Sequence, residues 1–163
     1  MARRPVKANG DGTYRLNLSK NERAMVTTVV PQLRAMLAGN PDHETLIRLF
    51  PTARPDDPEA EADYRALVRD ELVSKRLARL DTVGELAEAT VINREQLAAW
   101  IGTVNDIRLV LGTRLEVGEA DELDDASELP DPEDKTPESV ALSAYYYLGW
   151  LLENLVEASA SDL

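Results

Sequence analysis

The sequence predicts a mainly α-helical protein, a helical bundle of five or six helices with a small N-terminal β-hairpin. Three observations lead to this prediction. Apolar residues recur at spacings of three and four over most of the chain, which is the period of an amphipathic helix. Residue types that suit helix N-caps stand just before these stretches. Near the N-terminus the period changes to two, which is typical of a strand.

The hairpin is predicted over residues 5–18. Residues 9–12 read Asn-Gly-Asp-Gly, which is a strong turn signal because Gly and Asn tolerate positive φ. After the turn, Tyr14, Leu16 and Leu18 alternate with polar residues and therefore share one face. A lone hairpin is only marginally stable in water, so we expect this face to lie on the helices.

Capping motifs in the sequence indicate where the helices begin and end. A capping box from Ser19 to Glu22 opens a helix that Pro31 should kink or divide, with Gly39 as a left-handed residue at its end. Similar boxes begin at Thr82 and at Asn93. Helices are expected over residues 42–50, 58–80, 82–90, 94–115 and 137–158, and the three longest are expected to form the centre. On the helix over 58–80, the predicted buried side includes Tyr64, Leu67, Val68, Leu72, Val73, Leu77 and Leu80.

The length of 163 residues suits one domain, 1–163, with residues 1–18 as a hairpin arm. Residues 116–136 are predicted to form an acidic flexible loop. Between Glu119 and Asp134 there are nine acids and no base, whereas the net charge of the whole chain is −12. The remainder of the chain is therefore nearly balanced. A negative net charge opposes the approach of nucleic acid and of anionic lipid.

The sequence also suggests a compartment. It contains no cysteine, which fits a reducing environment. No run of about 18 apolar residues exists, so we expect no membrane span. The basic start is not followed by an apolar segment of the kind found in signal peptides. These features predict a cytoplasmic protein.

Residues for catalysis are scarce. His43 is the only histidine and there is no thiol, so typical metal sites and nucleophilic triads lack their parts. Glycine-rich phosphate-binding motifs are absent as well. We therefore expect no catalytic residues, no cofactor and no metal, and we predict that the chain is not an enzyme.

Two groups of side chains remain as candidates. Asp106, Arg108 and Arg114 lie on the most regular helix, and we interpret them as structural polar residues. If Asp106 is buried, it needs an arginine from another helix, such as Arg65, Arg69 or Arg76. The aromatic residues near the C-terminus cannot all face one way on a helix. Tyr146, Tyr147 and Trp150 are therefore candidates for a partner-binding surface or a homodimer contact.

A nucleic-acid interface is the alternative. Arg3, Arg4, Lys7 and Arg15 give the hairpin arm a basic character, and a hairpin beside helices is one way to bind DNA. Four bases, however, give only a small counterion-release contribution to binding. We do not expect direct binding of nucleic acid.

Several segments, taken together and in order, resemble one family. They are Tyr14-Arg15-Leu16, Leu49-Phe50-Pro51 with Asp56-Asp57-Pro58, Leu80-Asp81-Thr82-Val83, the stretch from Asn105 to Arg114, and Tyr147-Leu148-Gly149-Trp150-Leu151. They resemble an actinobacterial domain-of-unknown-function family that is often encoded beside the Clp-protease adaptor for N-terminal degrons. The resemblance covers almost the whole chain, and the stretch from Asn105 to Arg114 is its most specific part.

The resemblance implies a role in transcriptional control under oxidative stress, acting with a sigma factor through cysteines. It assigns no catalytic residues. This chain has no cysteine, so a thiol–disulfide switch within it is chemically impossible. Any regulatory role must be redox-blind, or a partner must do the sensing.

The sequence thus predicts a non-enzymatic regulatory or adaptor protein that acts by protein–protein contact in a transcriptional stress response. A homodimer is expected, with a sigma factor or RNA polymerase as the candidate partner. Two alternatives stay open. One is a transcription regulator that touches DNA through the basic hairpin, and the other is an unrecognised carboxylate-based enzyme.

Overall fold

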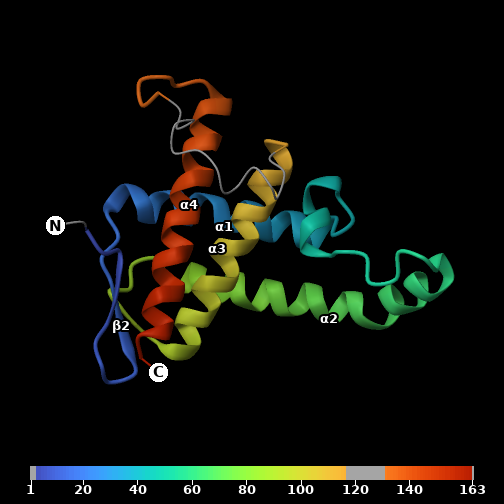
Figure 1. Cartoon of the computed structure of the whole chain (residues 1–163), viewed down its shortest axis with the longest axis horizontal. Coiled ribbons are helices and arrows are strands. Elements are labelled where there is room, and N and C mark those ends of the chain that lie inside the picture. Colours follow the sequence, from blue (N-terminus) through green and yellow to red (C-terminus); the bar gives the residue numbers. More distant parts are fainter. Residues whose placement is uncertain (1–2, 117–130, 163) are drawn as a thin grey trace.

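The computed structural model describes residues 3–116 and 131–162, and it is mainly helical, as predicted. Figure 1 shows long helices beside a small antiparallel sheet. The described helices are α1 (Lys20–Gly39), the 3₁₀ helix η1 (Glu44–Leu49), α2 (Pro58–Glu85), α3 (Arg94–Arg114) and α4 (Pro137–Ala160). The strands are β1 (Val6–Ala8), β2 (Thr13–Leu16) and β3 (Val91–Asn93). Among the described residues, no helix combines the length and the apolar character that a membrane span needs.

The predicted hairpin is confirmed, but it is part of a three-stranded sheet in the order β1-β2-β3. Gly10 and Gly12 in the turn have φ values of 84° and 83°, which favour glycine. Tyr14 of β2 pairs with Ala8 on one side and with Ile92 of β3 on the other. Its side chain is fully buried, so the apolar face of the sheet lies on the helices, as expected.

The short helix predicted over residues 82–90 was wrong. Helix α2 continues to Glu85, and β3 follows after a turn. The Thr82 hydroxyl donates to the carbonyl of Ala78 within the helix and does not cap a new one. Val83 is fully buried, like Leu80, so the same apolar face continues past the expected boundary.

Helix α1 begins as predicted and ends differently. Both hydrogen bonds of the capping box between Ser19 and Glu22 are present. Pro31 lies inside α1 without dividing it. Gly39 does not adopt the left-handed conformation; the helix ends at Asn40, whose backbone N–H donates to the carbonyl of Met36.

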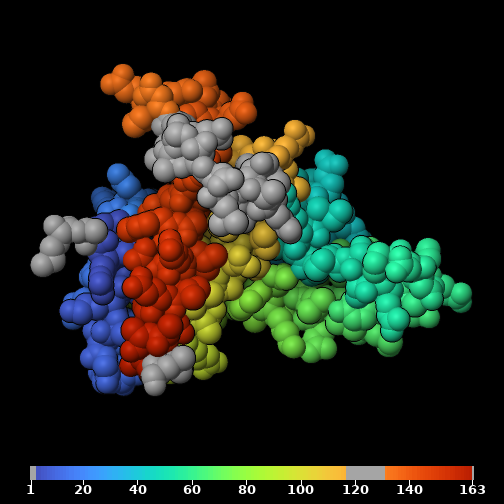
Figure 2. All heavy atoms as spheres, in the orientation of Figure 1, coloured from blue at the N-terminus to red at the C-terminus, as the bar shows by residue number. Residues whose placement is uncertain are grey.

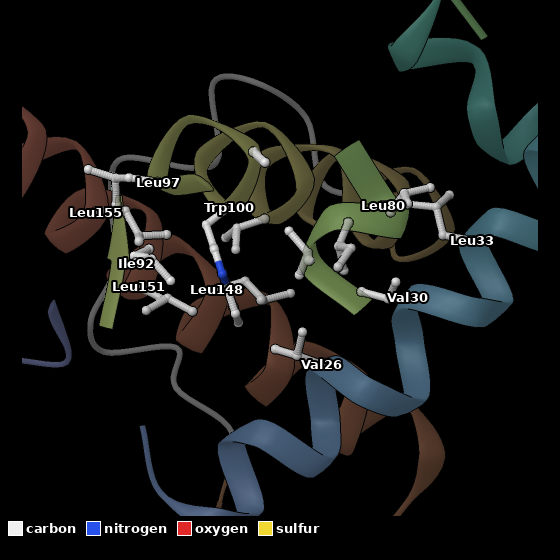
Figure 3. Close-up of a cluster of buried hydrophobic side chains, with 14 of the residues drawn as sticks. Val26, Val30, Leu33, Leu80, Ile92, Leu97, Trp100, Leu148, Leu151 and Leu155 are labelled. Carbon is white, nitrogen blue, oxygen red and sulfur yellow. The ribbon is translucent and has the colours of Figure 1, made fainter. Parts of the chain in front are cut away.

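The core lies where α3 packs between α4, α2 and η1, with α1 covering one side (Figures 1 and 3). Trp100 of α3 is at its centre and is 1% exposed. The surrounding apolar side chains come from four helices and from β3; they include Val26, Val30, Leu80, Ile92, Leu148, Leu151 and Leu155 (Figure 3).

The predicted buried side of α2 is only partly correct. Leu80 is buried, but Val68, Leu72, Val73 and Leu77 are half-buried, Tyr64 is exposed and Leu67 is 83% exposed. The 28 residues of α2 give this helix a length of about 42 Å. Its N-terminal half extends away from the other long helices (Figure 1).

Candidate interaction surface

A groove runs along one flank of α4. Its volume is about 470 Å³. Arg108 of α3 forms its floor, and α4 supplies the rest. The α4 residues that line it are Tyr145, Tyr146, Gly149, Trp150, Leu152, Glu153 and Val156.

Helix α4 carries two apolar faces, which explains why the groove exists. Leu148, Leu151 and Leu155 are spaced by three and four residues and are fully buried against the core. A second stripe follows Leu142, Gly149 and Val156 at intervals of seven residues. Val156 is 49% exposed, whereas Gly149 is covered by the side chain of Arg108 from α3. Figure 2 shows α4 on the outside of the molecule, beside the N-terminal hairpin.

Arg108 forms the floor of the groove by packing on an aromatic ring. The carbon of its guanidinium group lies 5.0 Å from the centroid of the buried Tyr145 ring. A Cβ atom on Gly149 would lie only 3.2 Å from Nε of Arg108. The glycine therefore leaves the space through which the arginine crosses α4.

Helix α4 directs the three predicted aromatic side chains to different sides. Tyr146 and Trp150 line the groove, and Trp150 is 37% exposed at its edge. Tyr147 lies on the other side of Trp150, with ring centroids 5.8 Å apart, and faces the N-terminal arm. Burial raises the pKa of Tyr147 well above its usual range, and the negative charge of Glu22 raises it further.

The basic arm is partly neutralised. Arg3 forms a bidentate ion pair with Glu22, in which Nη1 lies 2.9 Å from Oε2. The Arg3 guanidinium also lies 5.5 Å from the Trp150 ring centroid, so it holds the arm against α4. Lys7 and Arg15 are cross-strand partners and are exposed. Arg4 is exposed as well. Three of the four predicted bases therefore remain accessible.

Between α3 and α2, Asp106 forms a buried ionic cluster. Arg76 of α2 pairs with one carboxylate oxygen of Asp106, and Arg79 lies 3.2 Å from the other. Arg76 also donates to the carbonyl of Leu49, at 2.8 Å. Burial raises the pKa of Asp106, while the two guanidinium groups oppose that shift. The cluster joins α2, α3 and η1.

Arg79 was not among the arginines predicted to pair with Asp106, although it lies three residues after Arg76 and so on the same face of α2. Arg114, the third predicted structural polar residue, lies elsewhere. It borders a shallow apolar groove between α1 and α3, next to Met36 and Leu111.

A smaller pocket of about 220 Å³ lies between η1 and α2. Its ionisable side chains bear on the alternative that the protein is a carboxylate-based enzyme. Arg65, Arg69 and Arg76 line it, together with the carboxylate of Glu61. Each arginine is already paired, Arg65 with Glu61, Arg69 with Asp42 and Arg76 with Asp106.

The carboxylate of Glu61 in this pocket is suited to stabilising the loop between η1 and α2. Glu61 accepts a hydrogen bond from the backbone N–H of Arg54 at 2.7 Å. That bond, opposed by burial and helped by Arg65, holds the pKa of Glu61 below its usual range. A general acid needs a raised pKa, so these contacts favour a structural role. Within the part of the chain that the structure describes, no three metal-ligating side chains come together.

The chain matches the family model described as "Domain of unknown function (DUF2017)" over residues 3–159. The chain belongs to the DUF2017 family. The family resemblance inferred from its motifs is thereby confirmed. The match covers the sheet, the described helices except the last residue of α4, and the whole groove on α4.

This DUF2017 chain is also similar to curated proteins named "Oxidative stress regulator AosR". They come from Mycobacterium bovis and from two strains of Mycobacterium tuberculosis. Each is 36% identical over 98 residues, a match that covers 50% of this chain and 45% of the relative. The chain thus spans less than half the length of these relatives. No solved structure gives a match.

Proposed function

We propose that this DUF2017 protein is a non-enzymatic regulator in the oxidative-stress response that acts by protein–protein contact through the groove on α4. The groove itself is the observation that carries the proposal. It combines an exposed tryptophan, a tyrosine and an aliphatic stripe with one charge of each sign, Arg108 and Glu153. Aromatic residues and arginine are the types most enriched at protein interfaces.

The surrounding structure supports a role in protein–protein contact over a role in catalysis. The charged side chains of the pocket between η1 and α2 are engaged with one another or with acids of the same chain. The link with oxidative stress comes from the name of the relatives. The component of the transcription machinery that the family resemblance implies, a sigma factor or RNA polymerase, is the proposed partner class.

Site-specific photo-crosslinking in living cells tests this contact. A photoreactive amino acid replaces Glu153 at the border of the groove in one strain and Val140 in another. Val140 is a matched control because it lies on the same helix, is 52% exposed and does not line the groove. We expect a discrete protein adduct from position 153 and none from position 140.

The adduct is identified by mass spectrometry before and after peroxide treatment. A partner that belongs to the transcription machinery supports the proposal directly. Equal labelling from both positions, or no adduct from either one, would contradict it.

Direct DNA binding is the second candidate, and one observation favours it. The strand register places Lys7 opposite Arg15 on the outer face of the sheet, where two like charges lie side by side. A phosphate group would relieve their repulsion. The pairing of Arg3 with Glu22 removes one base from this surface, so we rank this function below protein contact.

A further inference from the structure

We propose that the pocket between η1 and α2 binds a small organic carboxylate, with Arg65 and Arg69 holding the acid group beside an apolar wall. The pocket shares no lining residue with the groove on α4, so this binding site is additional to the proposed contact function. Most of the α2 residues that line it belong to the N-terminal half of the helix, which extends away from the other long helices (Figure 1).

The side of α2 that borders the pocket is polar, although it lies against another part of the chain. Glu61, Arg65, Arg69, Leu72 and Arg76 follow one another at spacings of three and four residues, so they share one face of the helix. Like charges four residues apart on a helix repel each other, and Arg65 and Arg69 stand in that relation. An anion bound between them would remove this repulsion. The stripe therefore has the composition of an anion-binding surface.

Arg65 and Arg69 are held in place and still keep free donors. Arg65 uses only Nε, which donates to Glu61 at 3.0 Å. Arg69 uses only Nη2, which donates to the carbonyl of Pro41 at 2.9 Å and to Asp42 at 2.7 Å. Within the described part of the chain, the remaining Nη atoms of these two arginines form no hydrogen bond. They are the donors that a carboxylate needs.

Phe50 fixes the guanidinium groups at the wall of the pocket. The guanidinium carbons of Arg69 and Arg76 lie 4.2 Å and 5.4 Å from the centroid of its ring. A stacked guanidinium is pre-organised, so it loses little freedom when it binds a carboxylate. Both Nη atoms of Arg76 are engaged, one with Asp106 and one with the carbonyl of Leu49. The acid group is therefore assigned to Arg65 and Arg69, and Arg76 is assigned to the wall.

The charges around the pocket leave one positive charge unbalanced. The ion-paired groups are four arginines and three acids, namely Arg65, Arg69, Arg76 and Arg79 with Glu61, Asp42 and Asp106. The side chain of Asp42 is 78% exposed, so water weakens its pair with Arg69. In a chain with a net charge of −12, this local excess is unusual, and one carboxylate from a ligand would balance it.

The size and lining of the pocket narrow the class of ligand. Its volume of about 220 Å³ is below the roughly 300–1,000 Å³ of pockets for drug-sized molecules, so the ligand is small. Leu49, Phe50, Pro51 and Leu72 give it an apolar side that suits a ring or a short aliphatic group. The backbone N–H of Arg54 and the charge of Arg65 hold the pKa of Glu61 low, so its carboxylate repels a second acid group. A monocarboxylate is therefore favoured.

Titration of the full chain with benzoate, followed by two-dimensional ¹H–¹⁵N NMR, tests the proposal. Benzamide has nearly the same shape without the charge, and acetate has the charge without the apolar ring. We expect benzoate to bind more tightly than either compound, and the signals that shift to come from η1 and the N-terminal half of α2. The absence of benzoate binding, equally tight binding of benzamide or acetate, or shifts confined to other elements would overturn the inference.

Two charge-removing variants locate the site. Arg65 and Lys75 each pair with a glutamate four residues earlier on α2, and only Arg65 lines the pocket. Their side chains are 46% and 69% exposed, so both variants should fold, and thermal unfolding checks this. We expect Arg65→Gln to weaken benzoate binding about tenfold, because charge-assisted hydrogen bonds are lost, and Lys75→Gln to leave it unchanged.

Arg65→Lys separates geometry from charge. Lysine keeps the positive charge but lacks the planar pair of N–H groups that matches a carboxylate. We expect this variant to bind benzoate less tightly than the unmodified protein and more tightly than Arg65→Gln. Equal weakening by Arg65→Gln and Lys75→Gln would mean that benzoate responds only to the overall charge of the helix, and it would overturn the assignment of the site.

Discussion

Replacing Asp106 by Asn should destabilise the protein strongly, because it leaves two arginines without their shared acid. Asp106 is 2% exposed and accepts from Arg76 and Arg79. Asn has almost the same size, so the change removes the charge without opening a cavity. The test therefore isolates the electrostatic role of the cluster that joins α2 to α3.

The magnitude follows from the exposure of the two partners. Breaking a buried ion pair by removing one member costs about 3–5 kcal/mol, because the other charge stays buried. The side chain of Arg76 is 18% exposed and keeps its hydrogen bond to Leu49, whereas Arg79 is 37% exposed and regains water. We therefore expect Asp106→Asn to lower the free energy of unfolding by about 2–4 kcal/mol, at the lower end of the range.

Urea unfolding followed by circular dichroism measures this change. The matched control is Asp81→Asn, which breaks an exposed pair with Arg34 between α1 and α2 and should have only a small effect. If Asp106→Asn destabilises the protein no more than Asp81→Asn does, the cluster does not hold the helices together and the reasoning is refuted.

Three further predictions follow from the same structure. Leu155→Ala should lower the free energy of unfolding by about 2–5 kcal/mol because Leu155 is fully buried, whereas Leu67→Ala should change it by less than about 0.5 kcal/mol; comparable effects in urea unfolding would contradict the assigned core. Burial opposes ionisation of Glu22, but hydrogen bonds from Arg3 and Ser19 outweigh it and hold its pKa below the usual value. The stability from Glu22 is therefore present near neutral pH and lost as pH falls through the lowered pKa, so the thermal midpoints of the unmodified protein and Glu22→Gln should converge below about pH 4; a constant difference from pH 7 to pH 3 would exclude this role. Promoter DNA should not retain the protein even at about 50 mM salt, because few bases face an acidic molecule; salt-sensitive retention that Lys7→Ala abolishes would revive the DNA-binding alternative.

Local signals in the sequence predicted local structure well. The boxes at Ser19 and Asn93 are formed by side chains within three residues of each other, and both are present in the structure. The box pattern at Thr82 failed because the buried Val83 keeps the helix continuous. Burial in the tertiary structure therefore outweighed a capping pattern that depends on sequence alone.

Long-range pairing was harder to predict. Strand β3 has three residues and pairs with β2, which lies more than seventy residues earlier in the chain. A stretch this short gives no measurable alternation. The projection of α2 was missed for a related reason, because an apolar stripe does not reveal how far the body that covers it extends.

The candidate surface was predicted in part. The sequence indicated that the aromatics of α4 must diverge, and Tyr146 and Trp150 do line the groove. It did not indicate that Arg108 would lie across Gly149, because that contact joins two helices. The seven-residue stripe through Gly149 was visible in the sequence, but spacing alone does not decide which of two stripes faces the core.

The central claim is that the protein regulates by contact through α4, and complementation in cells tests it most directly. A strain that lacks the protein receives the unmodified chain, Val156→Arg or Val140→Arg, and its transcripts are measured after peroxide treatment. The account predicts that Val140→Arg restores the response and that Val156→Arg, present at the same level, does not. Full restoration by Val156→Arg would contradict it.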